Sequence, residues 1–230
     1  EGAPAQDTVA VMGVLVSVNL AVERVSPTDA AGLTGIDKRP VAGPVLVRAP
    51  GDRQTGLGSG LAGDLVLDRR HHGGDDQAVY AYAREDLDFW GAELGRALPG
   101  GVFGENLTPR GVDVTGALIG ERWLVGGQVL LEVSVPRIPC GLFAQWMAEP
   151  HWVRRFTAAA RPGGYLRVVE PGEVRAGDEI TVVSRPDHAV TVGFTFQALT
   201  TRPELLPHLA AARALPASVL ALAERRTDPA

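Results

Sequence analysis

Cysteine is nearly absent from this sequence, in which 230 residues include one, Cys140. A single thiol cannot form an internal disulfide, and it cannot build the thiolate clusters that hold structural zinc or iron–sulfur centres. Disulfides are rare in the reducing cytosol. The shortage of cysteine, together with the lack of an export signal, therefore predicts a cytoplasmic protein.

Long apolar runs and runs of basic residues are also missing. The apolar stretch 9–20 contains Gly13 and Asn19, and it is shorter than the roughly 20 residues that span a bilayer. The formal net charge is −5, and no long series of lysine or arginine occurs. The sequence therefore predicts neither a membrane nor a nucleic acid as a partner.

Glycine and proline are abundant, with 28 and 17 residues, and hydrophobic residues make up 45% of the chain. This composition predicts an α+β fold that is mostly β, with many turns and a sizeable core. Expected strands cover residues 9–18, 41–48, 65–67, 120–126, 128–135, 166–170 and 179–183, with a hairpin turn at Gly126-Gly127. Apolar residues at helical spacing predict helices over 77–98 and 142–159, the second interrupted at Pro150.

The composition changes after Pro186. Three Ala/Leu-rich pieces follow, at 191–199, 204–213 and 217–226, and Arg202-Pro203 and Leu215-Pro216 separate them. Pieces of this kind are typical of short helices. The sequence therefore predicts two domains, a mainly β domain over 1–188 and a three-helix domain over 189–230.

Several short motifs stand in a fixed order along the β domain. They are Gly63-Asp64 with Asp68, His72-Gly73-Gly74, Phe103-Gly104-Glu105-Asn106-Leu107, Pro136-Arg137-Ile138-Pro139-Cys140, residues 161–168 and Gly177-Asp178. Each motif alone is unspecific, but the ordered series resembles the MOSC domain family, named for the C-terminal domain of molybdenum-cofactor sulfurases. Within that family the chain is most similar to the bacterial YiiM-like branch, which carries a C-terminal three-helix domain.

The resemblance implies a closed β-barrel with flanking helices that binds a molybdenum–pterin cofactor (molybdopterin). It also implies reduction of N-hydroxylated compounds such as hydroxylaminopurines, amidoximes and hydroxylamines. A separate flavin or iron–sulfur reductase would supply the electrons. Two alternatives stay open: a cofactor carrier or sulfur-handling protein without turnover, and a barrel that binds no metal.

Cys140 is the expected molybdenum ligand and catalytic residue, because a thiolate is a soft, anionic donor. The alternative is an inert buried thiol, a frequent fate of free cysteine. Arg137, three residues earlier, is expected to lie close enough to favour the thiolate by its charge.

The cofactor ends in a phosphate, which arginine and lysine bind well. The candidates beside turns or strand ends are Lys38, Arg39, Arg137, Arg161 and Arg167. Each of them is alternatively a solvated surface charge, and Arg161 is alternatively a cap of the helix before it.

His72 is expected to contact the pterin or to donate a proton to the leaving oxygen, since its ordinary pKa lies near neutrality. Asn106 is preferred to Glu105 as a contact of the pterin ring, because an amide both donates and accepts at any pH. Asp64 and Asp68 are expected to bond turn amides. A zinc site at His71, His72, Asp75 and Asp76 is disfavoured, because adjacent side chains on a strand point apart.

Overall fold

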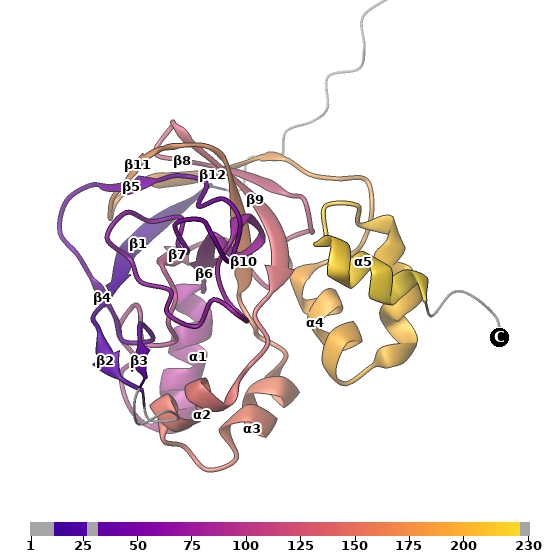
Figure 1. Cartoon of the computed structure of the whole chain (residues 1–230), viewed down its shortest axis with the longest axis horizontal. Coiled ribbons are helices and arrows are strands. Elements are labelled where there is room, and N and C mark those ends of the chain that lie inside the picture. The colour runs from indigo at the N-terminus through magenta and orange to yellow at the C-terminus, as the bar shows by residue number, and fades with distance from the viewer. Residues whose placement is uncertain (1–11, 27–31, 226–230) are drawn as a thin grey trace, which may run out of the picture.

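The computed structural model describes residues 12–26 and 32–225. Within them, seven strands form a closed ring of mixed β-structure (Figure 1), because β1 pairs with both β7 and β12. In ring order these strands are β12 (Glu179–Ser184), β8 (Arg122–Val125), β9 (Val129–Pro136), β10 (Gly164–Glu170), β6 (Val79–Ala81), β7 (Leu107–Arg110) and β1 (Met12–Ala21). The fold class expected from the sequence, a closed and mostly β barrel with helices, is confirmed.

β1 shows why this chain closes into a ring. Leu15 and Val18 are fully buried, whereas Val14 and Val16 are 37% and 40% exposed, so one face of the strand lines the core. A register shift between Leu15 and Ser17 bends the strand. The bend lets β1 pair with β12 at its start, β7 along its middle and β4 (Lys38–Pro40) at its end.

The predicted hairpin joins β8 to β9. Val125 pairs with Val129, so the turn consists of Gly126, Gly127 and Gln128, and both glycines have positive φ, 59° and 70°. Glycine adopts these angles without a steric penalty, which explains why this expectation from the sequence held.

Three other expectations were wrong. Residues 77–98 form no single helix: a 3₁₀ turn, η1 (Asp75–Gln77), leads into β6, and only Arg84–Leu94 is helical, as α1. All three β6 residues are buried between β7 and β10, and a short apolar run has the same pattern in a strand and a buried helix. Residues 65–67 lie outside any strand. Within 41–48 only β5 (Val45–Val47) forms, and it pairs with β11 (Gly172–Val174), which the sequence did not predict.

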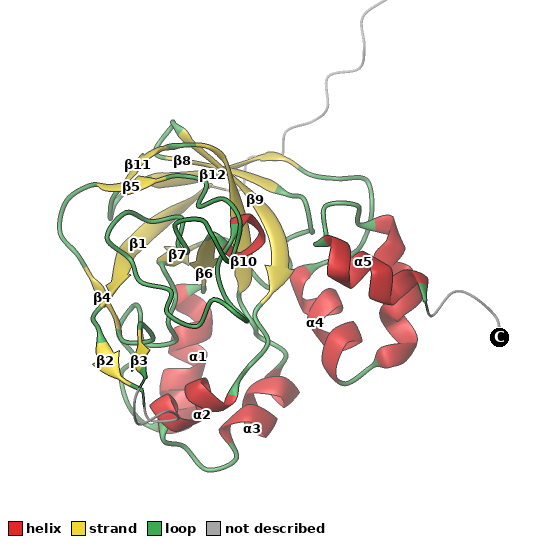
Figure 2. Ribbon diagram, in the orientation of Figure 1, coloured by secondary structure: helices red, strands yellow, loops and turns green. Residues whose placement is uncertain are grey.

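Helices cover one end of the barrel (Figure 2), where α1 lies beside α2 (Gly141–Met147) and α3 (Trp152–Ala159). The break between α2 and α3 falls at Pro150, as predicted. A second, aromatic core lies between these helices and the barrel, and its largest members are Tyr82, Trp90, Phe103, Phe143, Trp152 and Phe156. A small hairpin of β2 (Arg24–Val25) and β3 (Leu33–Thr34) stands outside the ring.

The three C-terminal pieces are α4 (Val192–Thr200), η2 (Pro203–Ala211) and α5 (Ala217–Glu224). The middle piece is a 3₁₀ helix, and Pro207 inside it cannot donate the backbone hydrogen bond of an α-helix. Phe196 packs against Phe156, with ring centroids 6.4 Å apart. Whether residues 189–230 form a separate domain stays a prediction. Within the described part of the chain, no helix has both the length and the apolar character to cross a membrane.

Candidate functional site

Cys140 stands at the junction of β9 and α2. Pro136 ends the strand, Pro139 prevents an immediate helix, and the backbone of Cys140 is still extended, with φ −118° and ψ 171°. Its carbonyl oxygen accepts the first helical bond, from the amide of Ala144 at 3.1 Å. The thiol is free and half-buried. Pro136 and Pro139 therefore fix the backbone of the strand-to-helix turn that carries the half-buried Cys140 thiol.

Arg137 is the cation of this turn. Only 5% of it is exposed, and its Cζ lies 3.6 Å from the centre of the Phe143 ring and 5.7 Å from that of Tyr80. Stacking on aromatic faces stabilises a guanidinium, but it satisfies none of the N–H donors. Nη1 is fully buried and has no acceptor among the described residues. Nη1 is therefore the donor of Arg137 that a bound anion would satisfy.

The His72-Gly73-Gly74 motif brings the imidazole of His72 within electrostatic range of Arg137. Gly73 has φ +87°, and a side chain there would lie 2.8 Å from the carbonyl oxygen of Gly58, so only glycine fits. His72 is largely buried, and burial followed by the charge of Arg137 lowers its pKa, while Asp68 partly opposes the shift. His72 is therefore neutral at pH 7.

Two tyrosines, neither of them expected from the sequence to belong to the site, complete this group. The rings of Tyr80 and Tyr165 lie 5.0 Å apart, and the hydroxyl of Tyr80 donates to the carbonyl oxygen of Pro162 at 2.8 Å. Burial raises the pKa of Tyr165, Arg137 opposes the shift, and Cys140 adds to it. Cys140, Arg137, His72, Tyr80 and Tyr165 thus form one cluster, called here the Cys140 cluster.

Lys38 and Asn106 belong to a different, buried polar network. The carboxylate of Asp64 accepts bonds from Lys38 Nζ at 2.5 Å, Ser59 Oγ at 2.6 Å and Asn106 Nδ2 at 2.9 Å, and the amide of Ala21 adds a fourth. Asp64 was expected to bond turn amides only, so its role as the centre of this network was missed. The Asp64 side chain is fully buried, and it supplies the counter-charge that the buried ammonium of Lys38 needs.

Asn106 joins this network to the Cys140 cluster. Its Oδ1 accepts the amide of Tyr80 at 3.1 Å, while Nδ2 donates to Asp64 and, at 3.4 Å, to the carbonyl oxygen of Asn19. Glu105 is likewise turned inward, where it accepts the amides of Gly101 and Phe103. A contact between Asn106 and the cofactor stays a prediction, because both polar atoms of its amide already have partners inside the protein.

The other predicted phosphate ligands are held by carboxylates. Arg161 Nη1 lies 2.6 Å from Asp86, and Arg167 pairs with Asp76 and Glu132. Arg39 pairs with Asp37 at 3.0 Å and keeps 56% of its side chain exposed. Phosphate binding by these arginines also stays a prediction. Their acidic partners lie 2 to 91 positions away in the sequence, so no local pattern could identify them all.

The zinc alternative at His71, His72, Asp75 and Asp76 was disfavoured from the sequence. No group of three or more His, Cys, Asp or Glu side chains in residues 12–26 and 32–225 could hold a metal ion. His71 Nδ1 instead contacts Asp68 at 3.0 Å on the surface.

A molybdenum cofactor fits the Cys140 cluster on two grounds. The half-buried thiol offers the soft anionic donor that such a metal prefers, and Arg137, whose Nη1 lacks an acceptor, complements the negative charge of thiolate and cofactor. The fit is weaker for the phosphate, since only Arg39 among the predicted cations outside the cluster has a largely exposed side chain. Cys140, Arg137 and His72 are the residues that would hold the cofactor's reactive end.

Comparison with known proteins gives the class of the chain. Residues 68–181 match the family model of the MOSC domain, and the chain belongs to the MOSC domain family.

Its relatives lie in the YiiM-like branch. The chain is 35% identical to the uncharacterized protein YflK of Bacillus subtilis over 161 residues, which are 70% of this chain and 68% of YflK. It is 30% identical to YiiM of Escherichia coli over 55% of this chain and 57% of YiiM. The crystal structure of YiiM from Geobacillus stearothermophilus superimposes with a TM-score of 0.73 at 27% identity, covering 94% of this chain and all of that one. A protein of Gibberella moniliformis named "Reductase" is 30% identical over 76% of this chain, which spans 34% of that longer protein.

Proposed function

We propose that this protein is a molybdenum-cofactor-dependent reductase of N-hydroxylated compounds such as hydroxylaminopurines, amidoximes and hydroxylamines. The observation that carries the proposal is the buried Arg137 guanidinium, which belongs to the same strand-to-helix turn as the free thiol of Cys140 and lacks an acceptor for Nη1. The reductase name of one relative agrees with this activity. The cytoplasm is the proposed compartment, because a protein with one cysteine needs no oxidising environment.

The reaction converts N–OH into N–H and water, and it consumes two electrons and two protons. The bound cofactor would supply the two-electron chemistry. Cys140 would hold the metal through its sulfur, and Arg137 would bind the negative charge of the thiolate and the cofactor.

His72 delivers a proton to the departing oxygen. The neutral imidazole first takes up one of the two protons that the reaction consumes. Its lowered pKa then makes the imidazolium a stronger acid than usual, and proton transfer to a leaving group is faster from a stronger acid. The tyrosine hydroxyls of Tyr80 and Tyr165 keep their protons at neutral pH, since burial raises the pKa of both.

For the cofactor's phosphate we propose Arg39 as the first ligand, because more than half of its side chain is exposed. Lys38, Arg161 and Arg167 would each have to exchange a carboxylate for the phosphate. Exchange is least favourable for Lys38, whose side chain is 8% exposed.

The test is metal and pterin analysis of protein produced in a host that makes the cofactor. We expect about one molybdenum per chain in the wild type, and at least a tenfold loss of molybdenum in Cys140→Ser and in Arg137→Met. The exposed arginine variant Arg202→Met is the matched control and retains the metal. Well-folded wild-type protein without molybdenum would refute the proposal.

A cofactor carrier is the second candidate. One observation favours it: the described residues include no cluster of ligands for a second redox metal, so nothing inside them relays electrons. Reduction of 6-N-hydroxylaminopurine by loaded protein with reduced methyl viologen separates the two. Turnover supports the reductase, and bound molybdenum without turnover supports the carrier.

A further inference from the structure

A charged groove runs along α1. It has a volume of about 530 Å³ and lies between α1 and the segments that follow α1 and β7. Its walls are Arg84, Leu87, Asp88, Gly91, Arg96, Ala97, Leu98 and Arg110. Three arginines and one aspartate give this lining a net charge of +2, in a chain whose formal net charge is −5. We call it the α1 groove.

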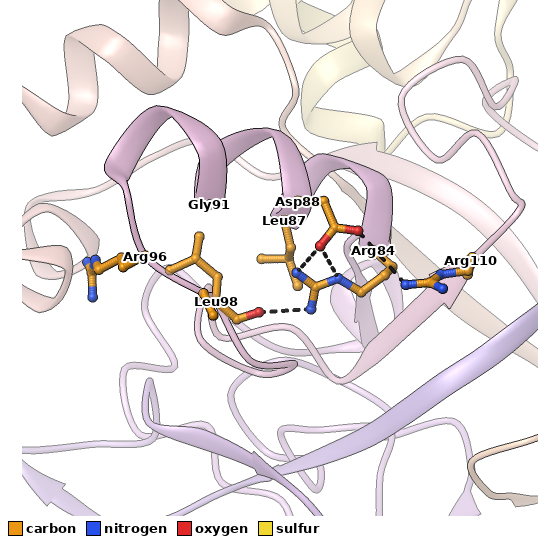
Figure 3. Close-up of a pocket in the computed structure, with 8 residues that line it drawn as sticks. Arg84, Leu87, Asp88, Gly91, Arg96, Leu98 and Arg110 are labelled. Atoms are coloured by element: carbon orange, nitrogen blue, oxygen red, sulfur yellow. Dashed lines mark hydrogen bonds and ion pairs between the residues drawn. The ribbon is translucent and has the colours of Figure 1, made fainter.

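Two of its arginines remain available to a partner. Figure 3 shows Arg96 and Arg110 at opposite ends of the groove, with Arg84 and Asp88 between them. Arg84 is 13% exposed and is bound by Asp88 and by the carbonyl oxygen of Leu98. Arg96 and Arg110 are 48% and 56% exposed, and their ion pairs are long, at 3.3 and 3.9 Å. Each therefore keeps N–H donors free for an acceptor in solution.

The nearby acidic groups do not cancel this charge. Glu149 is shared between Arg96 and Arg155, and Glu85 accepts the amide of Gly111. Glu93 is nine residues from Arg84, and 100° per residue places it on the opposite side of α1.

The groove is also close to the Cys140 cluster. Arg96 Nη2 lies 3.5 Å from the carbonyl oxygen of Met147, the last residue of α2, and Cys140 precedes that helix. Seven helical residues rise about 10 Å, so α2 spans about that distance between the turn of Cys140 and the contact of Arg96.

A series of aromatic contacts connects the two. Trp90 on α1 packs against Phe103 at 6.5 Å, Phe103 against Phe143 at 5.2 Å, and Arg137 stacks on Phe143. This continuous packed layer leads from the helix of the groove to the cluster.

We propose that the α1 groove is the docking surface for an acidic electron-carrier protein of the flavodoxin or plant-type ferredoxin kind. The inference rests on the proposed function, since a reductase that consumes two electrons in each turnover has to receive them from a donor. The carrier is oxidised by one electron in each encounter. Two encounters supply the two electrons that, with two protons, turn N–OH into N–H and water.

Charge and shape favour this occupant. Interfaces between electron-transfer partners are small and transient, and complementary charge mainly raises their association rate. An open groove with exposed guanidinium groups at both ends fits such an encounter better than it fits an enclosed small ligand.

The test is binding of oxidised flavodoxin to the full chain, measured by calorimetry at low ionic strength. We expect Arg96→Glu combined with Arg110→Glu to weaken binding at least tenfold, and Arg96→Ala combined with Arg110→Ala to weaken it less. The control variant is Arg175→Glu combined with Arg202→Glu, which changes the same charge at residues 69% and 55% exposed and leaves binding within twofold. Added salt weakens wild-type binding more than that of the groove variant.

Absence of binding by the wild type, or an equal loss in the control variant, overturns the inference. The binding measurement needs neither molybdenum nor turnover, so it stands apart from the proposed function. In loaded protein, the groove variant is expected to keep its rate with reduced methyl viologen and to lose at least tenfold with reduced flavodoxin. An equal loss with both donors also overturns the inference.

Discussion

Glu105 is a fully buried carboxyl group, and burial raises its pKa to about 7 in spite of the amides of Gly101 and Phe103 that it accepts. Ionisation of this group in the folded protein is therefore unfavourable. In the unfolded chain the same group ionises near its ordinary pKa of about 4.3. Between these two values the folded state binds more protons, so this group's contribution to stability falls as pH rises.

The prediction concerns the difference between the wild type and Glu105→Gln. The glutamine places an amide donor against backbone N–H groups, so the variant is less stable at pH 5. The difference in unfolding free energy is expected to shrink by up to about 3 kcal/mol between pH 5 and pH 8, because only the wild type loses this contribution. Urea unfolding at several pH values measures it. A difference that stays constant over this range would contradict the raised pKa.

Among the elements, the seam between β6 and β7 is the weakest part of the ring. It is the parallel pairing of the ring, and its ladder contains one residue pair, Ala81 and Leu107. Asn106 extends this ladder, because its side-chain Oδ1 accepts a hydrogen bond from the backbone N–H of Tyr80. Asp64 in turn accepts a hydrogen bond from Asn106 Nδ2 and so fixes the side chain. The Lys38–Asp64 pair behind Asn106 therefore supports both barrel closure and the position of Tyr80.

A double-mutant cycle tests this support. Asp64→Asn leaves the ammonium of Lys38 buried and without its counter-charge, and we expect a loss of about 3–5 kcal/mol. Combining it with Lys38→Met removes the unpaired charge, so we expect the double variant to recover more than half of that loss. Unfolding in urea gives all four values. Additive losses would show that the two side chains do not depend on each other.

The parts of this fold that local chemistry determines could be predicted from the sequence. Gly126-Gly127 and Pro150 act through their own backbone angles, and both were placed correctly. β6 and β11 could not be found in this way, because each is a three-residue strand that exists through its distant partners.

The same limit applies to the site. The motif order identified Cys140, Arg137 and His72, which the structure places in one cluster. Tyr80 and Tyr165 carry no motif of their own, and they join the cluster through the pairing of β6 with β10. The acidic partners of Arg161 and Arg167 are 75 and 91 residues away, where no spacing rule reaches.

At the scale of the whole molecule, Arg167 connects three regions. From β10 it binds Asp76 of η1 and Glu132 of β9, and Nη1 also donates to the carbonyl oxygen of Ala214 at 2.6 Å, ahead of α5. Val192, Phe196 and Leu209 of the C-terminal segment are fully buried. The C-terminal helices are thus fastened to the barrel by a charged bond as well as by apolar packing.

We therefore expect Arg167→Met to loosen the C-terminal segment more than the barrel. Hydrogen exchange of α5 amides is expected to become at least tenfold faster, while the amides of β8 and β9 change less than threefold. Arg122→Met is the matched control, since Arg122 also pairs with Glu132 but lies on the exposed side of the sheet. Equal acceleration in α5 and the barrel would mean that Arg167 supports the whole fold uniformly.

The closure of the ring by β1 and β12 has a consequence for synthesis. Met12 and Thr181 are paired, so the first strand of the barrel meets its last partner only after about 170 further residues have been made. At roughly 5–20 residues per second, β1 waits on the order of 10 to 30 s on the ribosome with an unsatisfied edge. Such long-range pairing slows folding and exposes apolar strands to aggregation. During that interval the nascent chain depends on chaperones, or on early formation of the β1–β7 pairing, to stay soluble.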